Sequence, residues 1–223
     1  VIPGGDRDSI TGSINRQLYL SRLSLSGLDE MHQYSLNEKL YEYLYYRPFT
    51  VISETRTYLN KLLALEGKKV EGRTAMGWFV RRLHDNKLLG TARLVNIDYG
   101  RQSVEWGWGF DPNFWGEGYI FELMDILKSY VFENLRLNKL FGVASVDNRR
   151  SISALLATGV QEEGILRQHY RDYNGNYHDA WAYSLLLHEY LEAKNIGKSD
   201  LLNCETKQIT KANFLAISRS LVI

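Results

Sequence analysis

Cysteine, proline and long apolar runs are scarce in this sequence. Of its 223 residues, one is cysteine, Cys204, and three are proline. A single cysteine excludes an internal disulfide and leaves no cysteine cluster for a metal, so we expect no metal site and a reducing compartment, the cytoplasm. The longest apolar run, 181–187, is far shorter than the roughly 20 residues that span a bilayer, so we expect no membrane-spanning segment.

An excess of charge of one sign is absent as well. The 27 lysines and arginines nearly balance the 26 acidic residues, which gives a formal net charge of +1. We therefore expect neither nucleic acid nor a membrane as a partner, and leave a homodimer open. The length and the 44% share of apolar residues indicate one soluble domain. We place it at 16–191, between a flexible N-terminal extension, 1–15, and a C-terminal extension of unknown role, 192–223.

Alternating or near-continuous apolar segments predict seven strands. Short connections that carry Asp, Asn or Gly, such as "LHDNK", "DYG" and "YNGN", predict hairpins between neighbouring strands. The run "KLFGVASV" lacks alternation and predicts a strand that is buried on both faces. The predicted strands are 17–25, 75–82, 87–97, 102–110, 139–146, 162–172 and 177–187.

Apolar residues at helical spacing predict the helices. Between residues 31 and 44 this spacing predicts helical segments that end before Arg47-Pro48. Ser53 is the predicted cap of the next helix, with an incomplete capping box because Arg56 stands where Glu is preferred. Two further helices are expected, one with an apolar stripe over 120–131 and one over about 149–157.

The predicted succession is an antiparallel meander, one β-α-β-α unit and a closing hairpin. This order predicts the α+β class, with a mixed, mostly antiparallel, seven-stranded twisted sheet flanked by helices.

A Gly-x-Gly sequence stands directly before the third of these helices, in "NFWGEGYIFEL". Glycine permits positive φ and close approach, so the N–H groups of Gly116, Glu117, Gly118 and Tyr119 can converge on a diphosphate. A plain turn explains an isolated Gly-x-Gly equally well. A nucleoside-triphosphate loop is excluded because no Lys-Ser or Lys-Thr follows, and a dinucleotide fingerprint lacks its third glycine.

Several motifs occur together in a fixed order: "VEWGWGF", "FWGEGYI", "NRRS", "TGV", "EEG" and "HDAWAYSLL". Over about 17–191 the sequence resembles the GCN5-related N-acetyltransferase superfamily, more narrowly its RimJ/RimL-like branch. The resemblance implies a GNAT-like fold and an acetyl-CoA-dependent N-acetyltransferase. It places the pyrophosphate of acetyl-CoA over the Gly-x-Gly loop and the pantetheine arm along the strand 102–110.

The resemblance also implies roles for single residues. It assigns the strand edge beside pantetheine to Trp108, Gly109 and Phe110, and a polar pair near the thioester to Asn148 and Ser151. The residues it assigns to the pyrophosphate loop are Trp115, Gly116, Glu117, Gly118, Tyr119 and Ile120. Asn148 suits a helix cap equally well. Asn113 stands where the superfamily often has Gln or Arg, so a cationic contact with the phosphates is lost. Arg149 or Arg150 can replace this contact; the alternative is that both lie on a solvated helix face.

The catalytic residues expected from the resemblance are Glu105 and Ser151. Glu105 is expected to take the proton of the amine through water, with a structural ion pair as the alternative. Ser151 is expected to protonate the leaving thiolate, because the helix after Asn148 lacks the tyrosine common in the superfamily. The amine then attacks the thioester directly in a ternary complex. The missing tyrosine and Asn113 support the alternative of a non-catalytic acyl-CoA-binding module.

The acceptor is expected to be a primary amine. An amino sugar, a polyamine, an antibiotic and a protein N-terminus all suit such a scaffold. Glu38, Glu42, Tyr43 and Tyr46 are candidates for binding it, although helix amphipathicity also explains them. His178 is expected to shape the closing hairpin or the acceptor mouth, and it cannot pair with Asp179 because neighbouring strand residues point to opposite faces.

Overall fold

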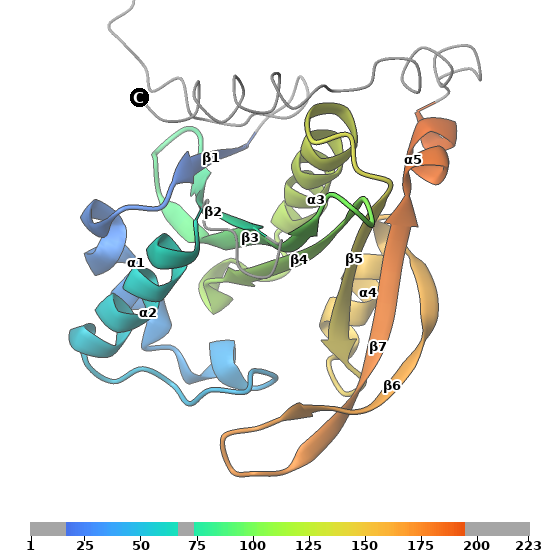
Figure 1. Cartoon of the computed structure of the whole chain (residues 1–223). Helices are drawn as coiled ribbons and strands as arrows, with labels where there is room; N and C mark the ends of the chain where they lie inside the picture. Colours follow the sequence, from blue (N-terminus) through green and yellow to red (C-terminus); the bar gives the residue numbers. More distant parts are fainter. Residues whose placement is uncertain (1–16, 67–73, 195–223) are drawn as a thin grey trace, which may run out of the picture.

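The computed structural model describes residues 17–66 and 74–194, in which one twisted sheet has the strand order β1-β2-β3-β4-β5-β7-β6 (Figure 1). Every neighbouring pair is antiparallel except β4 and β5, which are joined by the helical crossover and are parallel. The predicted fold class is therefore confirmed. The strands are β1 Leu18–Arg22, β2 Thr74–Arg82, β3 Leu88–Asp98, β4 Ser103–Phe110, β5 Lys139–Ser145, β6 Gln161–Arg171 and β7 Tyr177–Leu186.

Helices cover both faces of the sheet, because residues of β2 alternate between two apolar clusters. Phe79 packs with α1 and α2, whereas Trp78 and Val80 pack with α3, α4 and α5. The helices are α1 Leu28–Ser35, α2 Ile52–Leu65, α3 Tyr119–Ser129, α4 Arg149–Ala157 and α5 Leu187–Ala193. None of the helices in the described ranges is long and apolar enough to cross a membrane.

The segment between α1 and α2 differs from the prediction. The α-helix ends at Ser35, and only a 3-10 turn, Glu38–Tyr41, follows before α2. The side chain of Asn37 accepts a hydrogen bond from the backbone N–H of Lys39 and so starts that separate turn. The apolar spacing that resembled a helix instead serves a cluster of aromatic rings: Tyr41, Tyr45, Tyr46, Phe49 and Tyr58.

Three further details correct the sequence-based description. Ser53 does not cap α2, because Val51 is the N-cap and the Glu54 carboxylate accepts hydrogen bonds from the backbone N–H groups of Thr50 and Val51 at 2.8 and 3.3 Å. Strand β5 is not buried on both faces, since its residues largely alternate between buried and half-buried. Helix α5 was not predicted; Glu189 stabilises its start by accepting a hydrogen bond from the Leu186 N–H at 2.8 Å.

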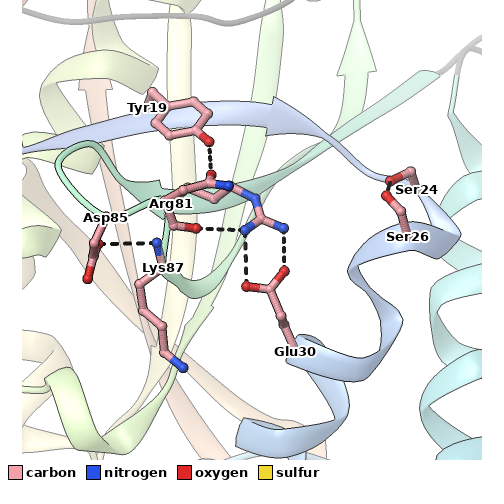
Figure 2. A network of polar contacts seen from close by, with 8 residues as sticks. Tyr19, Ser24, Ser26, Glu30, Arg81, Asp85 and Lys87 are labelled. Atoms are coloured by element: carbon pink, nitrogen blue, oxygen red, sulfur yellow. Dashed lines mark hydrogen bonds and ion pairs between the residues drawn. The ribbon is translucent and has the colours of Figure 1, made fainter.

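A partly buried ion pair attaches α1 to the β2–β3 hairpin (Figure 2). Arg81 of β2 donates two hydrogen bonds to the Glu30 carboxylate, at 2.7 and 3.1 Å, and a third to the Asn86 carbonyl at 2.8 Å. The hydrogen bonds from Arg81 lower the pKa of Glu30, which stays ionised. This bidentate contact adds to the apolar packing that holds α1 against the sheet.

Gly90 is expected to tolerate no side chain. A Cβ atom there would lie 2.1 Å from the Gly109 carbonyl oxygen, so β3 and β4 would have to separate. We expect Gly90→Ala to lower the free energy of unfolding by about 2 kcal/mol or more in urea denaturation. Gly109→Ala is the control, because its Cβ meets only Leu40 at 3.7 Å. Equal stability of the two variants would contradict this close approach of β3 to β4.

Candidate active site

Strands β4 and β5 pair along only part of their length. Their register contains the pairs Ser103–Lys139, Val104–Leu140 and Glu105–Phe141, and ends there. Beyond these pairs each strand keeps its other neighbour, β3 or β7, while the two facing edges have no ladder partner within the described ranges. We call this opening the splay. Free N–H and C=O groups along a strand edge suit an extended ligand that carries amide groups.

The loop from β4 to α3 turns its backbone outward. Gly116 and Gly118 have φ values of +86° and +81°, which side-chain-bearing residues rarely adopt. Gly118 is the N-cap of α3, and the first hydrogen bond of the helix runs from the Phe121 N–H to the Gly118 carbonyl at 3.0 Å, so the N–H groups of Gly118, Tyr119 and Ile120 precede the helical ladder. A Cβ atom at Gly116 would meet nothing within 4 Å, so the space above the loop is open. Bare N–H groups beside open space at a helix start fit the diphosphate of acetyl-CoA.

Side chains hold this loop from within. Trp115 donates its indole N–H to the Phe110 carbonyl at 3.0 Å. The buried Asp111 carboxylate accepts from the Asn113 N–H at 2.9 Å and starts a short turn. The first bond ties the loop to the last residue of β4, and the second orders the loop itself.

The start of α4 lies beside the loop. The Asn148 side chain accepts a hydrogen bond from the Ser151 N–H at 3.0 Å, so the capping role that was the alternative for Asn148 is confirmed. Ser151 is half-buried in the first turn. The Arg150 guanidinium lies 4.6 Å from the centre of the Trp115 ring, which joins this turn to the loop.

Glu105 lies at the closed end of the splay, in the last pair before β4 and β5 separate. Its half-buried carboxylate accepts a hydrogen bond from the Asn96 side chain at 2.7 Å. The ion pair that was the alternative for Glu105 is not found among the residues that the structure describes. Burial, together with the charges of Glu105 and Tyr45, raises the pKa of Tyr170 to about 12. Tyr170 also lines the pocket described next.

An acidic pocket opens between the segment 42–45, the end of β5 and the β6–β7 hairpin. Its cavity volume is about 190 Å³, enough for part of a small ligand. Its carboxylates are Glu42, Asp147 and Asp172, and no lysine or arginine is among the described residues that line it. Clefts lined by one sign of charge attract the opposite sign, so the pocket favours a cationic ligand. The other lining residues are Tyr43, Leu44, Tyr45, Ser145, Tyr170, Tyr173, Asn174 and His178.

His178 is paired with Asp172 across the hairpin. The imidazole Nε2 lies 3.1 Å from an Asp172 oxygen, while Asp179 accepts from the Gln168 N–H at 2.7 Å, so the predicted separation of His178 from Asp179 is confirmed. Desolvation opposes ionisation of Asp172, but hydrogen bonds from Asn176, His178 and Asn174 outweigh it and hold its pKa well below the usual range. The pocket therefore keeps this negative charge.

The structure brings some of the predicted acceptor residues together and separates others. Glu42, Tyr43 and His178 line the pocket, whereas Glu38 lies in the 3-10 turn and Tyr46 belongs to the aromatic cluster. The other lining residues were not predicted, and Asp147, Tyr170 and Asp172 are the most important of them for the charge of the pocket. Asp147 follows directly after a predicted strand, a position that can signal a site. No group of three or more side chains suited to a metal lies within 17–66 and 74–194.

Comparison with known proteins agrees with this geometry. Residues 17–161 match the acetyltransferase (GNAT) domain family. An uncharacterized N-acetyltransferase, p20 of Bacillus licheniformis, is 29% identical over 176 residues, which are 78% of this chain and 95% of that protein.

Two solved structures share the fold. A GCN5-related N-acetyltransferase from Brucella melitensis superposes with a TM-score of 0.73 at 23% identity, over 86% of this chain and 85% of that one. Spermidine N-acetyltransferase from Vibrio cholerae, in complex with CoA and spermine, gives 0.67 at 25% identity, over 79% and 99%.

The family match covers most of the described chain, and the splay and the glycine loop fit acetyl-CoA. The chain therefore belongs to the acetyltransferase (GNAT) family and is an acetyl-CoA-dependent N-acetyltransferase.

Proposed function

We propose that this enzyme, within the RimJ/RimL-like branch, acetylates a primary amine of a small cationic molecule in a reducing compartment, the cytoplasm. The acidic pocket carries the proposal. It has three carboxylates, four tyrosines and no lysine or arginine among its described lining residues. The carboxylates and the faces of the aromatic rings both stabilise a bound ammonium group. The motif order in the sequence supports the branch.

A polyamine is the first acceptor to test. The Vibrio cholerae relative is a spermidine N-acetyltransferase whose structure holds CoA and spermine. A polyamine carries several ammonium groups, so one can lose its proton and be acetylated while another stays bound among Glu42, Asp147 and Asp172. Amino sugars and amine-bearing antibiotics also present several cations, whereas a protein N-terminus presents one.

In the proposed mechanism the chain supplies binding, alignment and proton transfer. Acetyl-CoA provides a thioester whose thiolate is a good leaving group. The backbone N–H groups of Trp108 and Phe110, on the edge of β4 that faces the splay, donate hydrogen bonds to the acyl oxygen, a contribution of about 10²-fold in related chemistry. Glu105 takes the proton of the amine through a water molecule, and Ser151 returns one to the thiolate. Alignment of both reactants between β4 and β5 contributes most of the remaining acceleration.

The test is an acetylation assay with spermidine, glucosamine, kanamycin and a peptide with a free N-terminus. Release of the CoA thiol and the mass of the product are followed together. We expect turnover with spermidine above that with the peptide. Preference for the peptide would contradict the proposed acceptor class. Tight CoA binding without turnover of any amine would favour the non-catalytic acyl-CoA-binding module instead.

The pocket carboxylates give a prediction for acceptor affinity. We expect Glu42→Gln and Asp147→Asn each to raise the KM for spermidine about tenfold, because each removes one charge facing the ammonium groups. The KM for acetyl-CoA should change less than about twofold. Glu38→Gln is the matched control, with the same change of charge in the same segment outside the pocket. A larger effect of Glu38→Gln than of Glu42→Gln would place the acceptor at the 3-10 turn.

A further inference from the structure

The phosphate loop contains no cationic side chain of its own. Residues 111–119 read "DPNFWGEGY", with two acidic residues and neither lysine nor arginine. The Asp111 carboxylate is engaged with the Asn113 N–H, but Glu117 is exposed between the two glycines. Backbone N–H groups alone must then hold a doubly charged diphosphate beside a carboxylate. A cation from another element would offset this charge.

Three arginines lie near the loop along the chain or in space, and one of them, Arg82, already donates hydrogen bonds within the fold. Arg82 donates to both oxygens of Asp85, at 3.1 and 2.7 Å, and to the Tyr119 hydroxyl at 3.4 Å. Its donors are therefore largely used inside the fold. Arg149 and Arg150 remain, both exposed and both in the first turn of α4.

The structure separates these two neighbours. The Arg150 guanidinium stacks over the Trp115 ring, 4.6 Å from its centre, and Trp115 is itself fixed by its hydrogen bond to Phe110. Arg149 shows no such ring contact in the described part of the chain. Stacking uses the face of a guanidinium and leaves its N–H groups at the edge. Within 17–66 and 74–194 these N–H groups make neither a hydrogen bond nor an ion pair.

We propose that Arg150, held by the Trp115 ring, binds the pyrophosphate of acetyl-CoA and replaces the cationic contact that Asn113 cannot make. The proposal rests on acetyl-CoA as the cofactor of this site. Trp115 is a positioning residue: it keeps the guanidinium beside the open space above Gly116. A planar guanidinium suits two phosphate oxygens at once, so the substitution Arg150→Lys would not be conservative.

Calorimetric titration of the full chain tests this assignment with three ligands: CoA, dephospho-CoA and pantetheine. Dephospho-CoA keeps the pyrophosphate and lacks the 3′-phosphate, whereas pantetheine lacks both. We expect Arg150→Ala to raise the Kd for CoA and for dephospho-CoA about tenfold and equally. The Kd for pantetheine should be unchanged. Arg149→Ala, with the same loss of charge one residue away, should change each Kd by less than about twofold.

Two further variants examine the stacking. Trp115→Phe keeps a ring and should retain most of the affinity, whereas Trp115→Leu should approach Arg150→Ala. The double variant Arg150→Ala with Trp115→Leu should then have nearly the same Kd for CoA as Arg150→Ala alone, because the two residues act through one contact.

Several outcomes would overturn the proposal. An equal rise of the Kd for CoA in Arg149→Ala and Arg150→Ala would mean that both arginines act only through general electrostatic attraction. A loss confined to CoA would assign Arg150 to the 3′-phosphate. An equal loss with pantetheine would mean that the substitution disturbs α4. Failure of the unaltered chain to bind CoA would instead contradict the cofactor of the whole site.

Discussion

Glu105→Gln is expected to lower kcat for amine acetylation by about 10²-fold or more, while the Kd for CoA stays within about twofold. Glutamine preserves the shape and the hydrogen bond from Asn96 but cannot accept the proton of the amine. The half-buried carboxylate lies where β4 and β5 separate, on the same strand as Trp108. Turnover with spermidine and calorimetric titration with CoA measure the two quantities on the same preparation.

Asn96→Gly is the control for this substitution. It removes the 2.7 Å hydrogen bond to Glu105 but leaves the carboxylate, and glycine accepts the φ of +53° at this position. We expect its kcat to fall only a fewfold. Normal turnover of Glu105→Gln would contradict the role of Glu105 as the base. A loss as large in Asn96→Gly would indicate that the orientation of this strand, not the carboxylate, limits the reaction.

The second large effect is expected at the loop glycines. Gly118 caps α3 at a φ of +81°, where a β-branched side chain is strained by about 2 kcal/mol. Gly118→Val relieves this strain by turning the peptide groups on either side of it, which directs their N–H groups away from the phosphate. Losing two charge-assisted hydrogen bonds lowers the affinity for CoA by about 10²-fold or more. Titration with CoA measures the loss.

Gly159→Val is the matched control for the loop. Gly159 follows α4 with a φ of +86°, and a Cβ atom there would meet nothing within 4 Å. The strain is therefore similar, but it arises away from the cofactor. We expect Gly159→Val to lower the free energy of unfolding about as much as Gly118→Val and to bind CoA normally. Similar loss of CoA affinity in both variants would mean that strain anywhere in the domain weakens binding.

The order of the elements could be predicted because local signals were consistent. The turns "DYG" and "YNGN" predicted two hairpins, and the change from alternation to helical spacing after Phe110 predicted the crossover between β4 and β5. The segment 36–51 could not be predicted in the same way. Its tyrosines pack on one another and on Tyr58 of α2, so their spacing reflects a tertiary cluster and not a helix.

The cofactor side of the site was more predictable than the acceptor side. Gly116 and Gly118 are close in the sequence and need positive φ, so a short motif reveals them. Glu42, Asp147 and Asp172 come from three separate parts of the chain and meet only after the sheet has formed. The pairing of His178 with Asp172 forms across the turn of the β6–β7 hairpin, and this turn was predicted whereas the pairing of the two side chains was not.

The central claim is that acetyl-CoA occupies the splay between β4 and β5, with its diphosphate on the loop 115–119. A crystal structure of the chain soaked with CoA tests this most directly. We expect phosphate oxygens within hydrogen-bonding distance of the N–H groups of Gly116 to Tyr119, and pantetheine amides paired with the edge of β4 between Trp106 and Phe110. CoA bound elsewhere, or a continuous β4–β5 ladder that closes the splay, would contradict the account.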